Sequence, residues 1–82
     1  MKLFFENSRQ ERRLIGEPET VREAWDIIGD FLSEHNFKSY YQRINFFNDE
    51  WQIDVGSHTE FMWLSNLNED AEKYKKEMIG NG

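Results

Sequence analysis

Residues 39–55 constrain the fold of this 82-residue chain more than any other segment. Apolar and polar side chains alternate on either side of Asn48-Asp49, which is the pattern of a β-hairpin with one buried face. A two-residue turn at Asn48-Asp49 sets the register, because the large apolar residues then lie on the same face. The pairs on this face are Phe46 with Trp51, Ile44 with Ile53, and Gln42 with Val55.

The opposite face of this hairpin is polar. Asn45 lies across from Gln52, and Arg43 lies across from Asp54, so that opposite charges face each other between the strands. Such pairs are typical of an antiparallel sheet with one buried side and one side in water. We therefore predict that Arg43 and Asp54 are neighbours on the exposed face of the sheet.

The strand that follows residues 56–58 can join the sheet in one of two registers. A three-residue loop, with one residue in the left-handed conformation, brings Phe61 and Trp63 onto the apolar face. A loop with an even number of residues brings Glu60 into the core instead. We therefore expect residues 56–58 to form a three-residue loop, with Phe61 and Trp63 buried.

This register predicts a row of charges, Arg43–Asp54–Glu60, across three strands of the polar face. Glu60 lies opposite Asp54 in this row, where like charges repel, but Arg43 on the other side of Asp54 neutralises the pair. The same face exposes apolar and aromatic side chains: Tyr41, Phe47, Met62 and Leu64. Such a patch needs a cover, and the candidates are the C-terminal helix, a second copy of the chain, and another protein.

The N-terminal part of the chain is typical of a hairpin followed by a helix. Residues 2–6 and 11–16 are expected to be strands joined by a short polar loop. Residues 20–23 have the sequence of a capping box, which predicts a helix over residues 21–34 with one apolar face. Gly29 lies inside this helix, and we expect it to mark a close approach of the helix to the sheet.

The C-terminal residues predict a second, shorter helix. Asn66 and Glu69 have the spacing of a helix cap, and the apolar residues that follow form one narrow stripe. A helix this short is marginal in water, so it must dock on this fold or on a partner. The complete prediction is an α+β fold over residues 1–65, a five-stranded, mainly antiparallel sheet in ββαβββ order packed on one helix. Residues 66–82 form the C-terminal helix and tail of the same domain.

Composition excludes several classes of function. The chain has no cysteine, which rules out disulfides, thiol nucleophiles and thiolate metal sites. Its formal net charge of -6 disfavours generic binding to DNA or RNA. A basic cluster at Arg9, Arg12 and Arg13 keeps nucleic-acid binding open as a further alternative. We find neither a signal peptide nor a stretch near the roughly 20 apolar residues of a membrane span, and we expect a soluble, cytoplasmic protein without membrane contact.

The segment Asp54–Phe61, DVGSHTEF, contains the side-chain types of several active sites. Its serine and histidine are adjacent in a tight turn and point apart, so they do not make a nucleophile and its base. Asp54, His58 and Glu60 offer ligands for a divalent metal, but bridging by Arg43 explains the acids without an ion. We predict no catalytic residue, no metal site and no cofactor. A small-ligand site, metal site or enzyme at these residues is the alternative.

The sequences NFKSYY at residues 36–41 and IDVGSHTEF at residues 53–61 resemble small uncharacterised proteins encoded by phages and prophages of Gram-positive bacteria. The resemblance covers most of residues 3–65 and does not extend to residues 66–82. It implies no active site. What it implies is a phage accessory protein of unassigned role in the cytoplasm of a host cell.

These observations favour a non-enzymatic protein-interaction module that acts through the polar face of the sheet or through its acidic surface. We expect a protein partner, whose identity the sequence does not give, and an acidic inhibitor of a host protein is one form of this function. A homodimer through the same face is the alternative assembly. The candidate binding residues are Tyr41, Arg43, Phe47, Asp54, His58 and Glu60.

Overall fold

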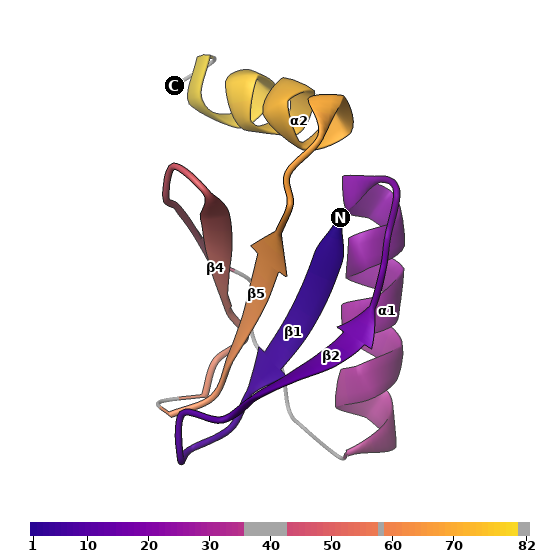
Figure 1. The fold of residues 1–82 in the computed structure, drawn as a ribbon, viewed down its shortest axis with the longest axis vertical. Helices are drawn as coiled ribbons and strands as arrows, with labels where there is room; N and C mark the ends of the chain where they lie inside the picture. Colours follow the sequence, from indigo (N-terminus) through magenta and orange to yellow (C-terminus); the bar gives the residue numbers. More distant parts are fainter. Residues whose placement is uncertain (36–42, 58, 81–82) are drawn as a thin grey trace.

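The structure is a computed structural model, and it describes residues 1–35, 43–57 and 59–80. Within these ranges the chain forms one five-stranded antiparallel sheet and two helices (Figure 1), which confirms the predicted α+β class and ββαβββ order. The strands are β1 (Lys2–Glu6), β2 (Arg12–Gly16), β3 (Arg43–Phe46), β4 (Glu50–Asp54) and β5 (Phe61–Ser65). The helices are α1 (Val21–Glu34) and α2 (Glu69–Gly80). Neither of these helices is both long enough and apolar enough to cross a membrane.

The first strand of the chain lies inside the sheet. The strand order is β2-β1-β5-β4-β3, so β1 pairs with β2 on one side and with β5 on the other (Figure 1). Of the four pairings between described strands, three join consecutive strands, and only β1 with β5 joins strands that are far apart in sequence. The sheet is therefore two locally connected parts that meet at β1 and β5.

α1 begins where the sequence predicts because its first turn is capped. The Thr20 hydroxyl accepts a hydrogen bond from the Glu23 amide at 3.1 Å. The Glu23 carboxylate accepts from the amide of Glu19 at 2.9 Å, one residue before the amide that the capping box predicts. The bond from the Glu23 amide satisfies one of the amides at the start of the helix that have no partner inside it.

The predicted role of Gly29 is wrong. Gly29 lies on the exposed side of α1, and apart from its own helix no described atom lies within 4 Å of the position that a Cβ would take. The close approach lies instead at Gly16 in β2, where a Cβ would stand 2.7 Å from the Cδ1 atom of Ile27. At this point α1 contacts the sheet through the end of the Ile27 side chain and not at Gly29.

The cap of α2 is Asn68 rather than Asn66. The Asn68 carboxamide oxygen accepts from the amide of Ala71 at 3.2 Å. Asn66 has a left-handed backbone, with a φ of 55°. That conformation differs from the extended one that a capping residue needs, and asparagine tolerates it better than most residues. The helix therefore begins later than the sequence predicts.

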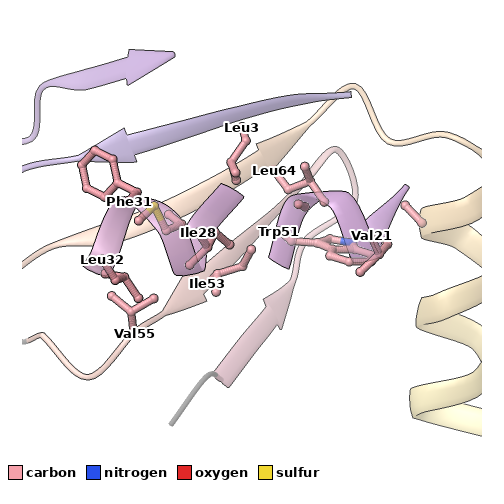
Figure 2. Close-up of a cluster of buried hydrophobic side chains, with 12 residues drawn as sticks. Leu3, Val21, Ile28, Phe31, Leu32, Trp51, Ile53, Val55 and Leu64 are labelled. Atoms are coloured by element: carbon pink, nitrogen blue, oxygen red, sulfur yellow. The ribbon is translucent and has the colours of Figure 1, made fainter. Parts of the chain in front are cut away.

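One face of the sheet, here called the inner face, packs against α1 (Figure 2). Trp51 and Ile53 from β4 lie on this face and are fully buried. α2 adds Ala71 to the same core, and Tyr74 of α2 packs against Trp51 with 5.8 Å between ring centroids. The core cluster consists of Leu3, Val21, Ala24, Ile28, Phe31, Leu32, Trp51, Ile53, Val55, Met62, Leu64 and Ala71.

α2 does not cover the opposite face of the sheet, here called the outer face. Figure 1 shows α2 lying across the end of the sheet, and its aromatic contacts are with the inner-face residue Trp51 and with Trp25 of α1. Of the three candidate covers of the outer face that the sequence suggested, the C-terminal helix is therefore excluded. Within the described residues, both helices pack on the inner side.

Candidate functional site

The hairpin of β3 and β4 has the predicted register. Arg43 pairs with Asp54 on the outer face, and Phe46 pairs with Trp51 on the inner face. The amide of Phe47 donates to the carbonyl of Glu50 at 3.0 Å, which closes the predicted two-residue turn. Arg43 and Asp54 are thus neighbours. Among the described residues, however, the ion pair joins Arg12 to Glu50.

The predicted register of β5 is wrong by one residue. Asp54 pairs with Phe61, whereas the prediction paired it with Glu60. Every side chain of β5 therefore lies on the opposite face from the one predicted. Met62 and Leu64 are in the core with no exposed surface, and Phe61 and Trp63 lie on the outer face.

The hydrogen bonds of Ser57 explain why this register does not bury the charge of Glu60 in the core. The Ser57 hydroxyl accepts hydrogen bonds from the amides of Thr59 at 3.4 Å and Glu60 at 3.2 Å, and it donates to the Glu60 carboxylate at 3.3 Å. The Asp54 carboxylate accepts from the amide of Gly56 at 2.9 Å, and Gly56 has a φ of 92°. The connection is wider than three residues and holds Glu60 half-buried in the turn, outside the predicted row of charges.

A different row crosses all five strands of the outer face. The pairing of neighbouring strands aligns Arg12, Glu6, Phe61, Asp54 and Arg43. The row has an arginine at each end, a carboxylate inside each arginine, and a phenylalanine at its centre. Of the predicted row, Arg43 and Asp54 remain, and Phe61 takes the place of Glu60.

Large apolar side chains also lie on the outer face, and none of them belongs to the core cluster. Phe47 is 50% exposed and Leu14 is 46% exposed. The ring of Phe47 stacks near Trp63, with 6.2 Å between centroids. Phe47 was predicted to lie here, and that prediction is confirmed. Among the described residues, the large apolar side chains on this face are Phe4, Leu14, Phe47, Phe61 and Trp63.

Arg12 crosses the outer face diagonally instead of bonding its neighbour Glu6. Its guanidinium lies 4.1 Å from the ring centroid of Trp63. It donates to both carboxylate oxygens of Glu50, at 3.1 and 3.3 Å. Glu50 is on β4, so Arg12 of β2 spans the two strands between them. The Trp63 indole N–H donates to Glu6 at 2.6 Å, and this bond fixes the ring beneath Arg12.

The alternative metal or catalytic site gains no support from the described residues. Tyr41 and His58 lie outside the described residues. Asp54 and Glu60 each bond to a different part of the turn, Asp54 to Gly56 and Glu60 to Ser57. No group of three or more histidine, aspartate or glutamate side chains that could hold a metal ion occurs within the described ranges.

The sequence prediction missed several residues of this surface, among them Glu6, Arg12, Phe61 and Trp63. One signal for them exists in β1, where Lys2, Phe4 and Glu6 share one side of a strand. Their neighbours depend on which strand lies beside β1, which periodicity does not reveal. Comparisons of the chain with protein families, with curated proteins and with solved structures found no match.

Proposed function

We propose that this chain is a non-enzymatic protein-interaction module that binds a protein partner through the outer face of its sheet. The observation that supports the proposal is an aromatic face that neither described helix covers. Contiguous apolar surface rimmed by polar residues is typical of protein-binding sites. Phe47 and Leu14 are the most exposed large apolar side chains of this face.

The partner in this proposal has a basic surface. The net charge of the chain is -6, so it attracts positively charged proteins and repels acidic ones. Exposed acids also follow one side of α1 at helical spacing, and the one basic residue of α1, Arg22, lies one turn before Asp26 at the start of that side. These acids are Glu23, Asp26, Asp30 and Glu34. Association is therefore expected to weaken as salt screens the charges.

The biological setting belongs to the same proposal. The resemblance to phage and prophage proteins supports an accessory role in the cytoplasm of a Gram-positive host. An acidic protein with an open aromatic face would act there as an inhibitor that occupies a basic site on a host protein. The outer face supplies the apolar contact in this proposal, and the net charge supplies the attraction.

Affinity capture from host lysate with matched variants tests the proposal. Leu14→Ser with Phe47→Ser removes exposed apolar surface from the outer face. Met78→Ser with Ile79→Ser removes comparable surface from α2, where those side chains are 56% and 57% exposed. A protein captured by the wild type and the α2 variant but lost with the outer-face variant is the expected result. A partner that the outer-face variant retains at low and moderate salt contradicts the proposal.

Solution molar mass separates a foreign partner from a second copy of the chain. The proposal expects a monomer of 10.0 kDa in light scattering. A mass twice as large that returns to the monomer value in the outer-face variant would assign the face to a homodimer. This measurement needs no lysate and is independent of the capture experiment.

A further inference from the structure

The outer face contains a hollow beside Phe61, near the turns at that end of the sheet. Its volume is about 410 Å³, within the roughly 300–1,000 Å³ that is usual for ligand pockets. The strands supply Glu6, Gln52, Phe61 and Trp63, and the turns supply Gln10 and Thr59.

The side chains of this hollow are suited to a cation. Glu6 is an acid, and none of the described residues that line the hollow is an arginine or lysine. The Oε1 atom of Glu6 accepts from Trp63, and among the described residues its Oε2 atom is left to accept from a ligand. Phe61 adds an aromatic ring, whose faces attract positive charge. Trp63 also lines the hollow, but the guanidinium of Arg12 already lies over its ring, 4.1 Å from the centroid.

Among the described residues, Arg12 forms its ion pair with Glu50 and not with Glu6, its neighbour across the strands. Arg12 pairs with Glu6 across the strands, but its guanidinium bonds to both oxygens of Glu50. Asp54 adds a second carboxylate on the far side of Phe61. The centre of the outer row is therefore an aromatic ring between two acids.

We propose that this hollow receives the guanidinium group of an arginine side chain from the protein partner. This inference rests on the proposed function, because it names the contact that the outer face makes. A guanidinium is flat, stacks on aromatic rings and carries five N–H donors with no acceptor. The hollow offers matching acceptors in the Glu6 carboxylate, the Gln10 carboxamide and the Thr59 hydroxyl. The Gln52 carboxamide oxygen already accepts from the Asn45 side chain at 3.0 Å and has one lone pair left for a ligand. A lysine ammonium would use fewer of these acceptors and would stack less well.

An NMR titration of the full chain tests the inference with small probes. The probes are N-acetyl-arginine amide, its neutral isostere N-acetyl-citrulline amide, and N-acetyl-lysine amide. The signal is the indole N–H of Trp63, together with the backbone amides of Gln52 and Phe61. We expect saturable shifts with the arginine probe and roughly tenfold weaker binding of the citrulline probe, because the charge-assisted hydrogen bonds are lost.

Two variants and one matched control locate the interaction. Glu6→Gln removes the charge but keeps a carbonyl oxygen for the Trp63 indole, so it leaves the fold intact. Asp30→Asn removes the same charge from the exposed side of α1. Glu6→Gln should weaken the arginine probe roughly tenfold and Asp30→Asn should leave it unchanged. Phe61→Leu, which keeps apolar volume without the aromatic ring, should weaken it by about threefold.

Four results would overturn the inference. They are absence of a saturable shift at Trp63, equal binding of arginine and citrulline probes, equal binding of arginine and lysine probes, and equal loss in Glu6→Gln and Asp30→Asn. The proposed function fails separately. If the probes do not bind but the variant at Leu14 and Phe47 still loses its captured partner, the interaction surface stands and only the arginine contact is wrong.

Discussion

The amide of Val21 donates a hydrogen bond to the carboxylate of Asp70 at 2.7 Å, so the second helix caps the first. Val21 begins α1, and its amide has no partner inside its own helix. A carboxylate at this position also interacts favourably with the helix dipole. Asn68 strengthens the junction by donating to the carbonyl of Glu19 at 2.8 Å. The start of α2 is therefore held against the start of α1.

Replacing Asp70 should destabilise the whole fold. Asp70→Ala is expected to lower the free energy of unfolding by about 1 kcal/mol, because it removes both the acceptor and the charge. Asp70→Asn keeps an acceptor and should cost less. Glu69→Ala is the matched control, since Glu69 is an exposed acid in the same turn, and its effect should stay within about 0.5 kcal/mol. Urea denaturation measures all three, and equal losses for Asp70→Ala and Glu69→Ala would contradict the cap.

Gly29→Ala should stabilise the protein by about 1 kcal/mol, because alanine is the better helix former and the site is open. The measurement is the midpoint of chemical denaturation at an unchanged m value. A loss of stability would mean that a neighbour lies against the Gly29 position.

Gly16→Ala should have the opposite sign. Its Cβ would meet the Cδ1 atom of Ile27, and the shift that this forces should lower stability by about 1 kcal/mol. Ile27→Val removes that Cδ1 atom and is the partner variant in a double-mutant cycle. The two changes should be coupled by at least about 0.5 kcal/mol in the favourable direction. Additive effects would show that the two positions do not touch.

Gln10→Gly should also stabilise the protein. Gln10 lies in the loop between β1 and β2 with a φ of 64°, a conformation that glycine adopts without a Cβ penalty. After the entropy cost of glycine in the unfolded chain, a gain of about 0.5 kcal/mol is expected. Ser8→Gly in the same loop is the control, because Ser8 has no positive φ to relieve. Thermal melts of both variants measure the change in stability. A gain from Ser8→Gly alone would contradict the prediction.

Alanine substitutions in β5 test the corrected register. Met62→Ala should cost about 2–5 kcal/mol, because Met62 is fully buried. Phe61→Ala should cost only about 1 kcal/mol, because Phe61 lies on the outer face. The reverse order of losses in urea denaturation would restore the register that the sequence predicted.

The register of β3 and β4 was predictable because strict alternation and a two-residue turn agree there. In β5 the residues 61–64 are all apolar, so either face satisfies the hydrophobic pattern. The observed register is accompanied by hydrogen bonds of Ser57 and Asp54 within the preceding turn. The sequence offered no sign of these bonds. The position of α2 escaped prediction for a similar reason, since Asp70 directs it to α1 and no periodicity encodes that contact.

The part of the candidate site that belongs to the β3–β4 hairpin was predictable from the sequence. Arg43, Asp54 and Phe47 lie on the outer face as expected, because the hairpin places them there. The acids and aromatic rings that complete the surface come from the register of β5 and from its pairing with β1. Such long-range pairing depends on the whole fold rather than on local pattern.

Glu6 and Trp63, which are 57 positions apart in the sequence, face each other across the contact of β1 with β5. The hairpin of β1 and β2 and the three strands β3 to β5 each form from local contacts, and the long-range contact between them is the slower step of assembly. The hollow lies on both sides of that contact, with Glu6 on one part and Phe61 on the other. An arginine bound there would act as a clamp across the sheet, so that release of the partner and separation of the two parts become linked events.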